Sequence, residues 1–165
     1  MKDVEFRIAT LHDTETLFNF SLQLQRLLEH SNPNVWKITK DGIEKKRVSI
    51  REMITKIDGR VILAEREGRT IGFISGFIRK REDYTPKIIG QIGIIYIIKP
   101  YRRQGIGTRL LKELLVFFEE KQVERIVVNY IAGTKEAETF WKKFDFNPVH
   151  ISSNIPIKVF KKKLG

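Results

Sequence analysis

The sequence predicts a single α/β domain, residues 1–165, built on a mixed β-sheet. Three observations lead to this prediction. The length of 165 residues is typical of one domain. Two strand-like runs between residues 60 and 80 share a short glycine-containing connection, which indicates an antiparallel hairpin. Residues 87–131 then read as strand, glycine loop, apolar helix and strand, an order that places two strands side by side in parallel.

The N-terminal third is predicted to hold one strand and two helices. Residues 4–11 (VEFRIATL) alternate well enough for a strand, and residues 13–32 begin with cap-forming side chains and continue with apolar residues at approximately helical spacing. Pro33 breaks this pattern, and a second helix is expected from about Asp41. Trp36 lies in the break, as either a core anchor or part of a substrate wall.

The central part of the chain carries the strongest signals. Residues 60–67 and 71–80 form the predicted hairpin, and residues 87–99 (KIIGQIGIIYIIK) are strongly β-prone. Residues 106–118 place their apolar side chains in one helical stripe. Residues 124–131 (ERIVVNYI) read as a strand that is buried on both faces and parallel to the one before the loop.

The C-terminal segment is predicted to add a short helix and one or two strands. Residues 134–146 (TKEAETFWKKFDF) give the helix and residues 150–164 the strands, with lysines 161–163 protecting an exposed sheet edge. The apolar run 155–160 (IPIKVF) either pairs across the two-fold axis of a homodimer or lies inside its own sheet.

Composition excludes several classes of protein. No apolar run approaches the roughly 18 residues of a membrane span, the N-terminus lacks the apolar segment of a secretory signal, and there is no cysteine. We therefore expect a cytoplasmic protein with no membrane partner. Because the three histidines are scattered, we expect no metal site. The net charge of +11 favours anionic partners without choosing among them.

Residues 101–111 (YRRQGIGTRLL) suggest an anion-binding loop. Gly105 and Gly107 leave the backbone open to close approach, and free N–H groups are expected where the following helix begins. Arg102 and Arg103 add positive charge beside them.

Two common phosphate-binding motifs do not explain this loop. A Walker A loop needs Gly-Lys-Ser/Thr, whereas Thr108 and Arg109 follow Gly107. A dinucleotide fingerprint needs a third small residue where Leu110 stands, and an acidic residue at the end of the next strand, where Glu124 is instead at its beginning.

The loop does resemble the pyrophosphate loop of the GCN5-related N-acetyltransferase (GNAT) superfamily, Arg/Gln-x-x-Gly-x-Gly/Ala, which residues 102–107 match. The run IIYIIKPYRRQGIG is similar to the family's strand and loop, although Pro100 is one place late and Arg103 replaces a common glycine. Residues 62–78 look like the family's central hairpin, and residues 134–146 resemble its later helical signature through Ala137, Phe140 and Phe146.

This resemblance implies a GNAT fold: a mixed central sheet of six to seven strands, about four flanking helices, and two central strands that splay apart at a bulge. It also implies an N-acetyltransferase that carries an acetyl group from acetyl-CoA directly to a primary amine of a small molecule, a protein N-terminus or a lysine.

The resemblance further assigns roles to residues of this chain. The backbone N–H of Ile97 would stabilise the oxyanion of the reacting thioester, with Ile95 and Ile98 beside it. Coenzyme A would be held by these three residues and by Arg102, Arg103, Gln104, Gly105, Ile106, Gly107, Thr108, Thr134, Phe140 and Trp141.

The catalytic acid and base are less regular. Trp141 stands where the family usually has a tyrosine that acts as the general acid. Tyr130 or Tyr96 could take over the role of that tyrosine. Gln91 stands where some protein-acetylating members have a glutamate base, and it cannot accept a proton at neutral pH. Glu82 or Asp83 could act through water, and we expect deprotonation by ordered water rather than by a dedicated carboxylate.

The acceptor remains open. The segments that select it in the family correspond to about residues 12–58 and 80–90, which are rich in basic residues. Acidic or phosphate-bearing acceptors are therefore favoured over polyamines, and a protein N-terminal amine is also compatible. The alternative is a non-catalytic acyl-CoA-binding regulatory module. Nucleic acid is not expected as the main partner, because no recognition helix is apparent.

Overall fold

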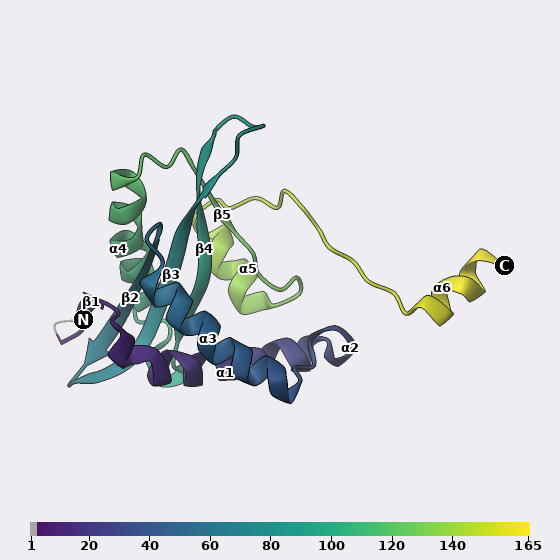
Figure 1. Ribbon diagram of the computed structural model, residues 1–165, viewed down its shortest axis with the longest axis horizontal. Helices are drawn as coiled ribbons and strands as arrows, with labels where there is room; N and C mark the ends of the chain where they lie inside the picture. The colour runs from purple at the N-terminus through teal and green to yellow at the C-terminus, as the bar shows by residue number, and fades with distance from the viewer. Residues whose placement is uncertain (1–2) are drawn as a thin grey trace. The chain divides into compact units, whose positions relative to one another are not determined.

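The computed structural model describes residues 3–165 of the chain (Figure 1). These residues divide into two compact units, Met1–Asn129 and Tyr130–Gly165, which are described separately. The first unit contains β1 (Glu5–Ile8), α1 (Thr14–Ser31), α2 (Pro33–Trp36), α3 (Lys40–Thr55), β2 (Gly59–Arg66), β3 (Arg69–Lys80), β4 (Ile88–Ile97), α4 (Ile106–Glu120) and β5 (Arg125–Val128), with 3-10 turns at Leu11–Asp13 and Lys99–Tyr101. The second contains α5 (Lys135–Lys142) and α6 (Ile157–Leu164).

The strands form one mixed sheet in the order β1-β2-β3-β4-β5. The first three pairings are antiparallel and the last, β4 with β5, is parallel. The antiparallel hairpin and the parallel pair that the sequence predicts are both confirmed. The expectation that β5 is buried on both faces is wrong, because Ile126, Val127 and Val128 are only half-buried on a strand at the edge of the sheet.

Helices cover both faces of the sheet. Successive side chains along a strand point to opposite faces of the sheet. On one face Leu63 and Phe73 pack with Leu17 and Phe20 of α1 and with Ile50 of α3. On the other face α4 lies so close that a Cβ on Gly76 or Gly90 would come within 2.9 Å of the Phe118 ring. Figure 1 shows α1 and α3 side by side across one face of the sheet.

The strand and helix counts differ from expectation. The described residues form five strands and six α-helices, whereas the family resemblance implies six to seven strands and about four helices. The predicted C-terminal strands are wrong: residues 147–156 have no regular structure and Ile157–Leu164 is the helix α6. Pro156 suits the start of a helix, and Lys161, Lys162 and Lys163 are good helix formers that a strand would not favour.

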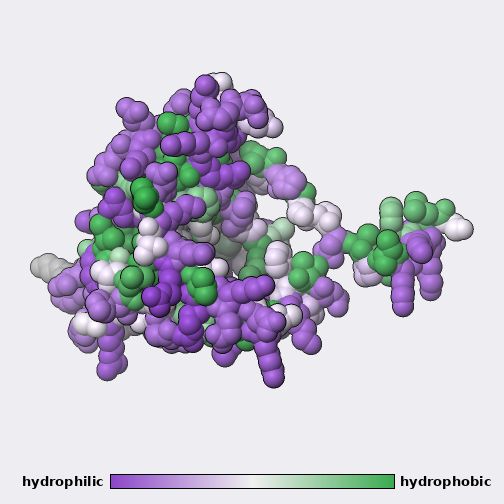
Figure 2. Space-filling view, viewed as in Figure 1, coloured by the Kyte–Doolittle hydropathy of each residue, from purple (hydrophilic) through white to green (hydrophobic). Residues whose placement is uncertain are grey.

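The second unit is built around aromatic side chains. Trp141 packs edge-on against Phe140 and Phe146, with ring centroids 5.0 and 5.2 Å apart, and Phe140 contacts Phe144 at 5.3 Å. The side chains of α6 are exposed, and Figure 2 shows that hydrophobic residues lie on one side of this helix and lysines on the other.

No helix among residues 3–165 is long and apolar enough to cross a membrane.

Candidate functional site

Among residues 3–165, no strand pairs with one edge of the C-terminal half of β4. The parallel ladder between β4 and β5 runs only from Ile89–Arg125 to Ile92–Val128, where β5 ends. Residues 93–97 continue to pair with β3 on their other side. β4 and β5 therefore diverge after Ile92, as the resemblance implies. Their divergence leaves the edge of β4 open over residues 93–97.

A β-bulge marks the point of divergence. Ser75 pairs with Ile94 and Gly76 pairs with Ile92, so Gly93 is the additional residue on β4. The backbone N–H of Ile94 donates to Ser75 Oγ at 3.0 Å. The serine hydroxyl thus satisfies an N–H group that the bulge has displaced from the regular ladder.

The bulge also determines which N–H groups point toward the open edge. The N–H of Ile98 donates to Ile71 O at 3.0 Å, on the β3 side. N–H groups alternate between the two edges of a strand, so those of Ile95 and Ile97 point away from β3. Ile95 and Ile97 can therefore donate to a ligand along the open edge. The N–H of Ile98 is already used.

The loop that follows β4 brings a helix start next to this edge. It begins with the 3-10 turn Lys99–Tyr101, and its left-handed residues are Arg103 (φ 64°) and Gly105 (φ 82°). Left-handed backbone favours glycine, which accounts for Gly105 and makes Arg103 the strained position of the loop. Gln104 Nε2 donates back to Pro100 O at 2.9 Å and closes the loop on itself.

The N-terminus of α4 supplies unpaired donors. Arg109 N–H donates to Gly105 O at 3.1 Å, the bond that starts the helical ladder. The N–H groups of Ile106, Gly107 and Thr108 precede it in the first turn, where a helix has no internal acceptors and carries partial positive charge. Arg103 and Gln104 are exposed beside them. This arrangement suits an anion such as a pyrophosphate.

The carboxylates proposed from sequence lie elsewhere. Glu82 and Asp83 are exposed in the turn between β3 and β4, beyond the Lys80–Ile88 pair. Ile97 is at the opposite end of β4, a strand of ten residues and about 30 Å. The structure does not bring these carboxylates together with the Ile97 N–H.

Gln91, expected at a base position, has a structural environment. It is 4% exposed, and its Nε2 donates to Val127 O at 3.2 Å and to Ile92 O at 3.1 Å. Its Oε1 accepts from Arg79 Nη1 at 3.3 Å. The Gln91 side chain therefore links β4 to β5 by a hydrogen bond, immediately before the two strands diverge.

Tyr96 faces α1 rather than the open edge. Its ring packs against Phe20 with centroids 5.1 Å apart, and its hydroxyl donates to Gln23 Oε1. Reaching a thioester at the open edge would require this buried side chain to leave the α1 face.

The predicted residues of the second unit are arranged as follows. Tyr130 is half-buried, and Thr134 is the N-cap residue of α5. Trp141 is 2% exposed and packs on its aromatic neighbours, while Phe140 is half-buried. Asp145 has a left-handed φ of 58°.

The segment between α1 and α3 presents an exposed tryptophan. Trp36 is 45% exposed, which rules out the core-anchor interpretation. The backbone of this segment is nevertheless held by α1: Gln25 Nε2 donates to Trp36 O at 2.6 Å, and Ile38 N–H donates to Glu29 Oε1 at 2.9 Å. Gln25, which is buried, was not identified from the sequence, where a glutamine within a helical pattern gives no such signal.

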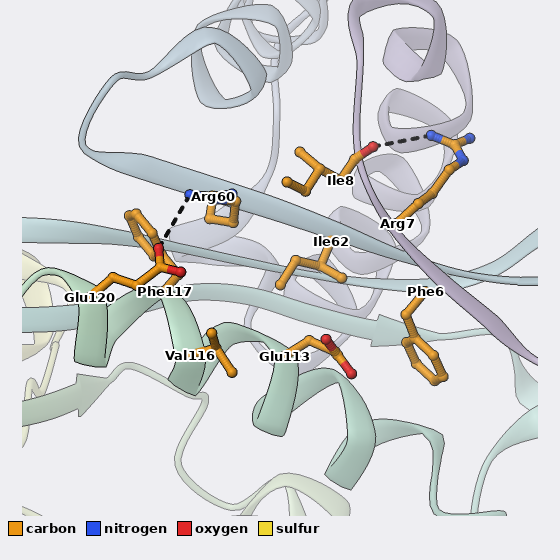
Figure 3. Close-up of a pocket in the computed structure, with 9 residues that line it drawn as sticks. All are labelled: Phe6, Arg7, Ile8, Arg60, Ile62, Glu113, Val116, Phe117 and Glu120. Atoms are coloured by element: carbon orange, nitrogen blue, oxygen red, sulfur yellow. Dashed lines mark hydrogen bonds and ion pairs between the residues drawn. The ribbon is translucent and has the colours of Figure 1, made fainter.

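A hollow of about 180 Å³ lies away from the loop between β4 and α4. It is lined by β1, β2 and the second half of α4 (Figure 3). Phe6 and Ile62 from the strands and Phe117 from α4 line it, and Arg60 pairs with Glu120 at 3.9 Å. Within residues 3–165 no group of three or more histidine, aspartate or glutamate side chains is placed to hold a metal ion.

Comparison with known proteins identifies a family for most of the chain. The family model described as "Acetyltransferase (GNAT) family" matches residues 22–146. No curated protein matches the chain by sequence.

Solved structures share the fold at low sequence identity. A mutant of the BH1408 protein from Bacillus halodurans aligns with a TM-score of 0.81 and 13% identity, over 92% of this chain and 98% of that chain. The ribosomal-protein-alanine N-acetyltransferase from Brucella melitensis biovar Abortus 2308 aligns with a TM-score of 0.68 and 16% identity, over 93% and 98%. AAC(6')-Iy, in complex with the bisubstrate analogue CoA-S-monomethyl-acetylneamine, aligns with a TM-score of 0.71 and 13% identity, over 93% and 97%.

Proposed function

This chain belongs to the acetyltransferase (GNAT) family, whose members use acyl-CoA, and we propose that it transfers an acetyl group from acetyl-CoA directly to a primary amine. The acceptor amine belongs to a small molecule, a protein N-terminus or a lysine side chain. One solved protein of the same fold was captured with a coenzyme A bisubstrate analogue, which supports coenzyme A as the donor.

One observation carries the proposal: the open edge of β4 ends beside a loop that starts a helix with unpaired N–H groups. An extended pantetheine arm can pair with such an edge as an additional strand. The Ile97 N–H then lies where it can donate to the thioester carbonyl and stabilise the negative charge that develops on its oxygen. Ile95 offers a second donor on the same edge.

The loop is the proposed pyrophosphate site. Successive N–H groups from Arg103 to Thr108 can donate to phosphate oxygens, and the positive end of α4 favours their charge. Thr134, Phe140 and Trp141 remain predictions from the family resemblance, as contacts to the rest of coenzyme A.

Proton transfer relies on solvent in this proposal. The Trp141 indole cannot donate a proton to the departing thiolate, and Gln91 cannot serve as a base. A thiolate is nevertheless a tolerable leaving group, because the pKa of a free thiol is about 8.5. Ordered water deprotonates the amine, with Tyr130 as the remaining candidate acid. An α-amino group, with a pKa of about 8, needs less assistance than a lysine.

Calorimetric titration with acetyl-CoA tests the donor. Wild-type protein is expected to bind with micromolar affinity, and Gly107→Glu, which introduces a side chain and a negative charge into the proposed pyrophosphate site, is expected to abolish binding while the protein remains folded. Dephospho-CoA serves as a ligand control. Absence of binding by folded wild-type protein would refute the proposal.

A thiol-release assay then separates an enzyme from a regulatory module. A screen of peptides, small amines and phosphorylated amines is expected to release free coenzyme A with at least one acceptor class. Tight acetyl-CoA binding without turnover across the screen would favour the non-catalytic alternative, for which Trp141 in place of a tyrosine is the supporting observation.

A further inference from the structure

Arg102 makes a direct contact with the proposed oxyanion donor residue. Its Nε donates to Ile97 O at 2.9 Å, across the turn Lys99–Tyr101 that connects the strand to the loop. Its guanidinium carbon also lies 5.9 Å from the centre of the Tyr96 ring. The side chain of Arg102 thus turns back onto the end of β4, although the sequence motif alone presents it as a cation for the phosphate loop.

The bond lies on the edge where the ligand is expected. The N–H and C=O of one strand residue point to the same edge, and the Ile98 N–H donates to Ile71 on the β3 side. The carbonyl of Ile97 is therefore on the open edge, together with its own N–H. A carbonyl oxygen has two lone pairs, so this bond leaves room for a second donor.

We propose that Arg102 is a positioning residue that holds the last residue of β4 so that the Ile97 N–H stays aimed along the open edge. This inference rests on the proposed function, because it concerns the same thioester site. A strand end without a partner on one edge opens readily by local fluctuation. On the β3 side the Ile98–Ile71 bond restrains this end, and the Arg102 bond restrains it on the other.

The competing explanation is that Arg102 contributes only its positive charge to pyrophosphate binding. Two substitutions of equal length separate the explanations. In Arg102→Gln the amide nitrogen occupies the same place along the side chain as Nε and retains an N–H donor. In Arg102→Met a methyl group occupies that place and no donor remains. Both variants lose the same charge, so they differ chiefly in the bond to Ile97.

The readout is the acetyl carbonyl itself, observed by isotope-edited infrared spectroscopy of [1-¹³C]acetyl-CoA. In wild-type protein and in Arg102→Gln the bound carbonyl band is expected at lower wavenumber than in free acetyl-CoA, as donation from Ile97 requires. In Arg102→Met the band is expected to return toward the free position. Calorimetry is expected to show that the preference for acetyl-CoA over coenzyme A is about 3- to 10-fold smaller in Arg102→Met than in Arg102→Gln, the value of one hydrogen bond.

A ligand-free measurement supports the same comparison. Hydrogen exchange of the Ile98 N–H is expected to be about 3- to 10-fold faster in Arg102→Met than in Arg102→Gln, because the strand end loses its second restraint. Equal carbonyl bands and equal exchange in the two variants would overturn the positioning role and leave charge as the contribution of Arg102. If folded wild-type protein binds no acetyl-CoA, the proposed function itself fails, and the inference fails with it.

Discussion

Ser75 and Gly93 oppose each other at the bulge so closely that each restricts what the other can be. A Cβ on Gly93 would lie 2.9 Å from Ser75 Oγ, a distance that real Cβ atoms do not adopt. The same hydroxyl accepts the Ile94 N–H at 3.0 Å and is therefore held in place. The small residue and the hydroxyl together make the irregularity at which β4 leaves β5.

We predict that Gly93→Ala destabilises the protein by about 1–3 kcal/mol, because the added methyl group overlaps Ser75 Oγ. The other neighbours of that Cβ, Ser75 O at 3.7 Å and Phe77 Cε1 at 3.9 Å, are at ordinary contact distances. Ser75→Ala alone is expected to cost about 1–3 kcal/mol, since the Ile94 N–H loses its acceptor. Urea denaturation of both single variants measures these values.

The double variant is the control for this explanation. Because Ser75→Ala removes the atom that the methyl group meets, the cost of Gly93→Ala should fall by about 1 kcal/mol in that background. Strictly additive costs would show that the Ser75 hydroxyl is not the obstacle.

A second prediction concerns the buried amide of Gln91. In Gln91→Glu a carboxylate would face the carbonyl oxygens of Ile92 and Val127, which now accept N–H bonds from the amide. Arg79, at 3.3 Å, compensates only partly. We expect a loss of about 2–4 kcal/mol at pH 8, and no gain of a catalytic base.

This loss should depend on pH in a defined direction. Burial raises the pKa of the introduced carboxyl above its value in the unfolded chain, so the destabilisation is present at high pH and disappears as the group is protonated. Unfolding at pH 8 and pH 5 is expected to show a smaller loss at pH 5. Gln122→Glu, at an exposed position, should change stability by less than about 0.5 kcal/mol at both values. A loss independent of pH would contradict a buried carboxylate.

The order of elements in the first unit could be predicted from the sequence because local patterns there agree with the tertiary fold. The stripe of residues 106–118 faces the sheet, and the glycine loop immediately precedes α4. The family resemblance implied a bulge in the long strand, but its position at Gly93 and its partner Ser75 could not be found from the sequence, since cross-strand register depends on the whole sheet.

The C-terminal segment shows where local patterns are insufficient. Ile155, Ile157 and Val159 alternate as in a strand, yet the structure makes a helix from Ile157 onward. Strand preference depends on neighbouring strands, whereas lysines 161–163 favour a helix without any neighbour. Gln91 and Arg102 illustrate a similar limit, because a motif position suggests a chemical role and only the contacts show what the side chain does.

A third prediction uses the C-terminus of α4. Gln122 has a left-handed φ of 54°, and the Val123 N–H donates to Phe118 O at 3.0 Å, as in a Schellman motif. A side chain in this conformation is strained, so Gln122→Gly should stabilise the protein by about 0.5–1 kcal/mol. The adjacent Lys121→Gly, at φ −93°, should destabilise it by a similar amount. Thermal and urea unfolding would contradict this if both variants shifted in the same direction.

The last prediction concerns acid stability and the Arg7–Asp13 pair. Arg7 donates to both carboxylate oxygens of Asp13, at 2.7 and 2.8 Å, and the Thr10 N–H donates to the same group at 2.7 Å. The bonds from Arg7, followed by the Thr10 N–H, outweigh burial and lower the pKa of Asp13 from 3.8 to about 2. Between these values the unfolded chain binds more protons than the folded one, so stability increases with pH.

Lowering the pH from about 4 to 2 should therefore remove the stabilisation from this pair. Because Arg7 is partly exposed, we expect the pair to contribute about 1–2 kcal/mol at pH 7, and Asp13→Asn should lose this amount and flatten the dependence between pH 4 and 2. Glu15→Gln, which disrupts an exposed pair with Arg47, should leave the stability and its dependence on pH nearly unchanged, because solvent screens such a pair. Urea denaturation across this pH range measures all three proteins. An unchanged slope in Asp13→Asn would mean that other carboxylates, rather than the one held by Arg7, control acid unfolding.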